Sequence, residues 1–138
     1  MRNLFVVAFL ALSISGLKAE TLNCGGTEPF WNLTINESSE KISFDDFSGD
    51  DADTKVYKKL KVKTTSNDLS VRFFKAKKGL RGQDTATAFV SKTDGTYRSF
   101  CSDGMSDFNY QYEIFANIEG RILQGCCESR LAPRLGGE

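Results

Sequence analysis

Four cysteines are the residues of this chain with the clearest chemistry. Cys24 and Cys101 stand far apart, whereas Cys126 and Cys127 are adjacent. The N-terminus has the features of an export signal, and an exported chain meets an oxidising compartment. An even number of cysteines in that setting indicates disulfides rather than thiol chemistry. A redox role for the adjacent cysteines is disfavoured, because the chain has no C-x-x-C motif.

Glu28 paired with Asp103 or Asp107 has the best prospect of acid–base chemistry, and the segments of Glu28 and Asp103 also carry the distinctive Trp31 and Met105. A glycosidase-like site would need two such carboxylates on either side of a bond. The alternative is that both carboxylates cap backbone amides in turns. Trp31, in an alternating segment, is more typical of a core residue than of a sugar-stacking platform. We therefore name Glu28, Trp31, Asp103 and Met105 as candidate binding residues and expect no catalytic residue.

The composition excludes several kinds of site. The chain contains no histidine, which excludes Ser-His-Asp and Cys-His nucleophiles and the usual zinc sites. Met105 near cysteines is a poor copper site, because disulfide-bonded sulfur is not a thiolate ligand. No glycine-rich loop has the context of a phosphate cradle. We expect no metal and no cofactor.

The expected signal peptide comprises residues 1–19. Arg2 gives a positive start, Leu4–Leu12 an apolar core, and Ala19 a small residue before the cleavage point. The apolar run is shorter than the ~20 residues that span a bilayer. Residues 20–138 are expected to form a single domain, periplasmic or secreted, with no membrane span.

The elements that must position these residues are short strands, because apolar and polar residues alternate with a period of two. Asp94-Gly95 and Glu119-Gly120 are candidate tight hairpins, and one helical turn is expected near 129–135. We predict an all-β fold, either a small antiparallel barrel of about eight strands or a sandwich, stapled by disulfides. The apolar positions of the expected strands are Trp31, Leu33, Ile35, Ile42, Phe44, Val56, Leu60, Val62, Leu69, Val71, Phe73, Ala86, Ala88, Val90, Phe108, Tyr110, Tyr112, Ile114, Ile122 and Leu123.

Charge is segregated along the chain. Residues 20–54 carry nine acidic residues and one basic residue, Lys41, whereas Lys55–Arg81 carries ten basic residues and one acid, Asp68. The basic segment could contact polyanions. We favour the interpretation that hairpins of opposite charge pair across one sheet face and that lysines protect an edge strand. The lysines lack interleaved aromatics in the sequence, so no nucleic acid is expected as a partner.

Two motifs resemble those of an uncharacterised family of bacterial exported proteins and lipoproteins. Gly26–Trp31 matches the family's G-[NT]-E-P-F-W signature, and Cys101–Ser106 with Gly125-Cys126 matches its later C-x-D-x-M-S stretch and closing G-C pair. The resemblance spans about residues 22 to 135. It implies an all-β, barrel-like domain of the cell envelope and no established activity. The chain departs from the family in lacking a lipid-attachment cysteine and in having a second closing cysteine, Cys127, for which Cys24 is the natural partner.

The pairing of the cysteines can be narrowed. A bond between the adjacent Cys126 and Cys127 is set aside, because it would close a strained ring. On a strand, neighbouring side chains project to opposite faces, so one cysteine can reach Cys24 and the other Cys101. The preferred pairing is Cys24–Cys127 with Cys101–Cys126, and the swapped pairing is the alternative. Either arrangement is expected to bring the two signature segments together.

Three functions are consistent with these features. The preferred one is a non-enzymatic envelope domain that binds a protein, a wall fragment or a small ligand at one end of the barrel. The second is an inhibitor of a hydrolase such as lysozyme, with loop 102–107 as the plug. The third is a hydrolase that uses Glu28 and Asp103.

Overall fold

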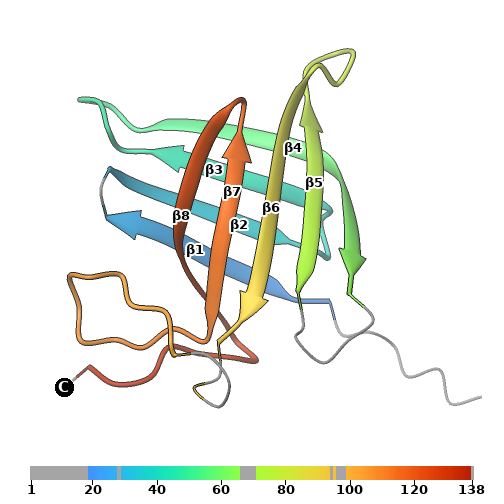
Figure 1. The fold of residues 1–138 in the computed structure, drawn as a ribbon. Helices are drawn as coiled ribbons and strands as arrows, with labels where there is room; N and C mark the ends of the chain where they lie inside the picture. The colour runs from blue at the N-terminus through green and yellow to red at the C-terminus, as the bar shows by residue number, and fades with distance from the viewer. Residues whose placement is uncertain (1–18, 28, 66–70, 94, 96–98, 138) are drawn as a thin grey trace, which may run out of the picture.

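The chain forms a closed antiparallel barrel in which each strand pairs with its neighbours in the sequence (Figure 1). A computed structural model describes residues 19–27, 29–65, 71–93, 95 and 99–137. The last strand pairs with the first, with Cys24 opposite Cys127, and so closes the barrel. The eight strands are β1 (Thr21–Thr27), β2 (Phe30–Asn36), β3 (Lys41–Asp46), β4 (Asp53–Thr64), β5 (Arg72–Lys78), β6 (Asp84–Lys92), β7 (Tyr112–Ile118) and β8 (Arg121–Ser129). The prediction of an all-β, eight-stranded, disulfide-stapled barrel is confirmed, and the sandwich alternative is excluded.

Large apolar side chains fill the barrel interior. The alternation in β2 directs Trp31, Leu33 and Ile35 inward, as predicted, and each is at most 2% exposed. In β6 the alanines Ala86 and Ala88 point inward while Phe89 points outward. Other inward residues with essentially no exposure are Leu22, Ile42, Tyr57, Phe74, Val90, Ile114 and Cys127.

The prediction for β4 is wrong in its alternation. Val56 is exposed and faces outward, whereas Tyr57 and Leu60 face the core. Val62, although 41% exposed, lies opposite the buried Phe74 of β5 and so on the inner face. A β-bulge lies between Lys58 and Lys61, where the register against β5 shifts. The extra residue changes which side chains face the core on either side of it.

Three predictions of local structure have different outcomes. Glu119-Gly120 does form the two-residue turn between β7 and β8, and both residues have positive φ, as a type I′ turn requires. Asp94 lies outside the described residues, so the Asp94-Gly95 hairpin is not tested; β6 ends at Lys92 and β7 begins at Tyr112. The expected helical turn near 129–135 is wrong: no helix occurs among the described residues, and the Ser129 hydroxyl accepts backbone N–H bonds in a turn there. Consequently, no helix of the described chain is long and apolar enough to cross a membrane.

A buried charged cluster closes the barrel end where β8 terminates. The Arg72 guanidinium donates to Glu20 and to Glu37 at 2.9 Å and 3.0 Å, and it lies over the ring of Tyr112. Ser129 donates to the same Glu20 carboxylate. Burial raises the pKa of Glu37, although Arg72 opposes this shift. Because each charge has a partner, polar groups can close this end without the penalty of an isolated buried charge.

Glu119 organises a second cluster at the opposite end. Its carboxylate accepts hydrogen bonds from the Tyr57 hydroxyl at 2.7 Å and from the ammonium groups of Lys78 and Lys55 at 2.9 Å and 3.3 Å. These bonds, first those from Tyr57 and Lys78, lower the pKa of Glu119 to about 2. Burial raises the pKa of Tyr57, and the bond to Glu119 raises that of Lys78. The barrel is therefore apolar in the middle and ionic at both ends.

We expect Glu119→Gln to lower the free energy of unfolding at neutral pH by about 1–3 kcal/mol, because it removes the charge that Tyr57 and the lysines hold. The lowered pKa gives the sign of the pH dependence. The carboxylate stabilises the fold above its unfolded pKa of 4.5 and loses this effect as the pH falls toward about 2. The stability difference between the parent and Glu119→Gln should shrink over that window in denaturant titrations. Asp50→Asn, in the exposed loop between β3 and β4, is the control and should change stability by less than about 0.5 kcal/mol. A difference independent of pH would contradict this role of the charge.

The favoured interpretation of the charge segregation is only partly right. Acids of the N-terminal segment do pair with basic residues, as Glu20 and Glu37 do with Arg72. The outward lysines of β4, however, face lysines of β5 and not acids: Lys58 is opposite Lys77, and Lys61 is opposite Lys75.

Candidate functional site

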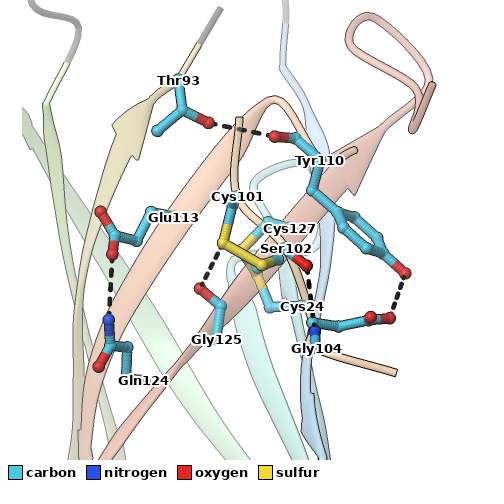
Figure 2. The surroundings of a disulfide bond; sticks show 12 residues. Cys24, Thr93, Cys101, Ser102, Gly104, Tyr110, Glu113, Gln124, Gly125 and Cys127 are labelled. Atoms are coloured by element: carbon cyan, nitrogen blue, oxygen red, sulfur yellow. Dashed lines mark hydrogen bonds between the residues drawn. A yellow bond between two sulfur atoms is a disulfide. The ribbon is translucent and has the colours of Figure 1, made fainter. Parts of the chain in front are cut away.

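Two disulfides lie side by side on β8, and one of them fixes the connection between β6 and β7 against the wall of the barrel (Figure 2). Cys24–Cys127 joins directly opposite residues of β1 and β8, and both of its cysteines are buried among the core residues. Cys101–Cys126 lies on the outer face of β8 and ties Cys101 of the connection to that strand. This is the pairing that the sequence favours, and the swapped alternative is not formed. The alternation of side chains along β8 explains it, because adjacent cysteines face opposite sides of one strand.

Asp103 organises the segment that follows Cys101. Its carboxylate accepts hydrogen bonds from the backbone N–H groups of Met105 and Ser106 at 3.0 Å and 2.8 Å, from the Ser106 hydroxyl at 2.8 Å and from the Tyr110 hydroxyl at 3.3 Å. Cys101 and Tyr110 also exchange two backbone hydrogen bonds of 2.9 Å. The segment 101–110, which we call the stapled loop, is thus closed at its base and ordered at its tip.

The hydrogen bonds to Asp103 also determine its charge. The backbone N–H groups of Ser106 and Met105 are the main cause of a lowered pKa for the Asp103 carboxyl. A carboxylate that is stabilised in its ionised form is a poor proton donor at neutral pH. Of the two interpretations that the sequence allows, the turn-capping one describes the observed geometry of Asp103.

Trp31 does not line an accessible site. Its side chain is 2% exposed and lies against Phe44, with ring centroids 6.4 Å apart. Two glycines make room for the indole: a Cβ on Gly125 would lie 2.8 Å from Trp31 Cζ2, and one on Gly26 would lie 2.7 Å from Cε2. Trp31 is therefore a core residue, and the end of the barrel near it is packed.

The structure places only some of the remaining candidates. Glu28 lies outside the described residues. Met105 is 68% exposed at the tip of the stapled loop. The two signature segments do meet, because the Thr27 hydroxyl donates to the backbone carbonyl of Asp103 at 3.0 Å. What converges on Asp103 is thus the end of β1 and not the indole.

A groove of about 450 Å3 runs along the outer face of β1 and β2 beneath the stapled loop. Its floor contains Gly25, which has no side chain to fill the space between Asn32 of β2 and the Cys101–Cys126 bridge. Phe30, 55% exposed, lies in register with Thr27 at one end of the groove. Asn23, Asn32, Thr34 and Asp45 add polar groups, while Asp103, Tyr110, Glu128 and Arg134 complete the lining.

The C-terminal segment braces the far side of this groove. Arg134 stacks on the ring of Phe108 with its guanidinium carbon 3.9 Å from the centroid, and it pairs with Glu128 at 3.7 Å. Asn109 and Leu135 exchange two backbone hydrogen bonds of 2.8 Å. Figure 1 shows the C-terminal segment beside the connection that precedes β7. The groove is consequently bounded by sheet, by stapled loop and by C-terminal segment.

Sequence reasoning missed most of the groove. The sequence does not show that Asn23, Asn32, Tyr110 and Arg134 meet, because only the strand register brings them to one place. The one available signal was the alternation itself, which directs Asn23 and Asn32 outward beside the signature glycines.

Within the described residues, no group of three or more His, Cys, Asp or Glu side chains is placed to hold a metal ion. Comparison with protein-family models, with curated proteins and with solved structures gives no match.

Proposed function

We propose that this domain is a non-enzymatic binding module of the cell envelope and that its binding site is the groove under the stapled loop. The observation that carries the proposal is the groove itself, whose glycine floor leaves space that a side chain would otherwise occupy. The sequence alone predicts a site at one end of the barrel. The packed interior around Trp31 and the ionic clusters at both ends favour the outer wall instead.

The order of the groove supports recognition. Its walls are held by a disulfide, by the Asp103 turn and by two backbone bridges at the base of the stapled loop. A site that is ordered before binding loses less conformational entropy when its ligand arrives. Two disulfides also agree with a location outside the cytosol, where they persist.

The lining favours a short glycan or another fragment of a cell wall as the ligand. Phe30 offers an exposed aromatic surface, and the side-chain amides of Asn23 and Asn32 can both donate and accept hydrogen bonds. A few polar groups beside an aromatic surface are a common arrangement for orienting a small ligand. The state of Asp103 agrees with binding without hydrolysis, because the carboxylate is engaged within its own loop.

We expect Asn32→Ala to weaken the binding of soluble disaccharide–peptide fragments of peptidoglycan about three- to tenfold, because one hydrogen-bonding side chain contributes about 0.5–1.5 kcal/mol. Isothermal titration calorimetry measures the affinity. The matched control is Thr87→Ala, which removes an outward polar side chain of β6, four strands away around the barrel. Equal affinity of Asn32→Ala and the parent, or no binding of these fragments, would contradict the proposal for this ligand class.

The stapled loop also supports the second candidate, an inhibitor of a hydrolase such as lysozyme. Met105 projects from an ordered turn and is 68% exposed, as a plug for a partner's cleft would be. Lysozyme activity measured with and without the protein separates the two functions. Unchanged activity and no complex on size-exclusion chromatography would remove this candidate.

A further inference from the structure

The outer face of β4 and β5 carries a dense group of lysines. Lys58 stands opposite Lys77, and Lys61 stands opposite Lys75, in adjacent antiparallel strands. No ion pair joins any lysine of this group to an acid of the described chain. We call this surface the basic face; its residues are Lys58, Lys59, Lys61, Lys63, Lys75 and Lys77.

The like charges of the basic face work against folding. Lysines directly opposite each other across two strands repel, and an acid in one strand would turn each repulsion into attraction. Part of this arrangement suits an exposed edge, because residues 61–64 extend beyond the pairing of β4 with β3. Lys75 and Lys77, in contrast, lie in β5, which pairs with β4 on one side and with β6 on the other and therefore has no edge to protect. An external anion would relieve this repulsion.

A row of phenylalanines continues the basic face around the barrel. The strand register places Phe73 opposite Phe89 and Phe89 opposite Phe115, with Lys63 opposite Phe73 at the start of the row. Phe89 and Phe115 are 54% and 44% exposed. The sequence separates these aromatics widely, which is why no interleaving of lysines and aromatics could be seen there.

An exposed aliphatic tip lies at the other border of the basic face. Leu80, in the turn between β5 and β6, is fully exposed (Figure 1, the olive turn above β5 and β6). A hollow of about 740 Å3 brings Leu80 and the exposed Val56 together with Lys58, Lys77 and Arg81. Apolar groups thus stand among cations on both sides of the basic face.

We propose that the basic face and its apolar borders bind reversibly to the surface of a bilayer that contains anionic lipid. The lysine ammonium groups contact lipid phosphates, while the phenylalanine rings and Leu80 enter the boundary between head groups and acyl chains. A bilayer offers negative charge and hydrocarbon in one surface. A soluble polyanion satisfies the lysines but leaves Leu80 and Val56 in water, and the Phe73 and Phe89 rings, 4.8 Å apart, leave no slot for a nucleobase between them.

The test uses Lys75→Glu, which changes the basic face without threatening the fold. The new carboxylate lies opposite Lys61, so the variant should be at least as stable as the parent. We expect it to weaken binding to vesicles of phosphatidylcholine with phosphatidylglycerol at least tenfold, measured by cosedimentation. Arg130→Glu is the matched control, because it makes the same change of charge at an exposed residue just after β8, and it should bind like the parent apart from a small long-range effect.

A second variant tests the apolar contact. Leu80→Ser leaves the charge unchanged and is expected to weaken vesicle binding about three- to tenfold, with the loss persisting at high salt. Asn32→Ala, in the groove, should bind vesicles like the parent, so failure of the groove proposal and failure of this one are distinguishable. Equal binding to vesicles of phosphatidylcholine alone, or full affinity in Lys75→Glu, overturns the proposal. Binding to heparin or single-stranded DNA without binding to anionic vesicles also overturns it, in favour of a soluble polyanion.

Discussion

Replacing Cys24 and Cys127 together by alanine is expected to lower the free energy of unfolding by about 4–5 kcal/mol. The disulfide spans a sequence separation of 103 residues, so its loss restores much conformational freedom to the unfolded chain. The same substitution removes two sulfur atoms from the core at the junction between β1 and β8, where the first and last strands of the sequence close the barrel. Denaturant unfolding followed by circular dichroism measures the loss, and the thermal midpoint should fall by more than about 10 °C.

The second disulfide provides the comparison. Cys101 and Cys126 are separated by 25 residues, so their replacement by alanine should cost less, about 3–4 kcal/mol. This double variant should keep the closed barrel but lose the order of the stapled loop, and with it the affinity of the groove. Equal losses of stability and of groove affinity in the two double variants would contradict the separate roles assigned to the two bonds.

Trp31→Ala is expected to lower the free energy of unfolding by about 3–5 kcal/mol, since it empties the space that Gly26 and Gly125 leave for the indole. The cavity would lie beside the pairing of β1 with β8, where the glycine backbones cannot move inward without breaking the ladder. Urea titration is the measurement. The control is Phe30→Ala, the preceding residue of the same strand, which points outward and should cost less than about 1 kcal/mol. A change of less than about 1 kcal/mol for Trp31→Ala would show that the indole is not a core element.

The fold could be predicted largely because alternation is a local signal. Trp31, Leu33 and Ile35 face one side of β2 for the same reason that Cys126 and Cys127 face opposite sides of β8: successive side chains of a strand point in opposite directions. The same rule explains why both disulfides could be proposed before the register was known. It fails in β4, because the bulge between Lys58 and Lys61 inserts a residue that the sequence does not mark.

The site could be predicted only where it is local. Asp103 caps backbone amides two and three residues ahead, an interaction within reach of sequence reasoning. Asn23 and Asn32, in contrast, meet Arg134 and Tyr110 in one groove only because β1 pairs with both β2 and β8, which brings together residues that are far apart in the sequence. The row of Phe73, Phe89 and Phe115 likewise exists only in the register of three strands. Trp31 belongs to the same signature segment as Glu28, but the strand turns its indole away from the surface.

The two neighbouring cysteines link the disulfide pairing to the register of β8. If Cys126 took the inner partner, β8 would have to rotate by one residue, and Leu123 and Ser129 would turn toward water while Gln124 and Glu128 entered the core. In that isomer both disulfides are formed, but the inward and outward side chains of β8 are exchanged. Thiol–disulfide exchange therefore has a thermodynamic gradient to follow, because only the correct isomer buries its apolar surface. In the oxidised protein, the pairing of the cysteines therefore determines which side chains of β8 face the core.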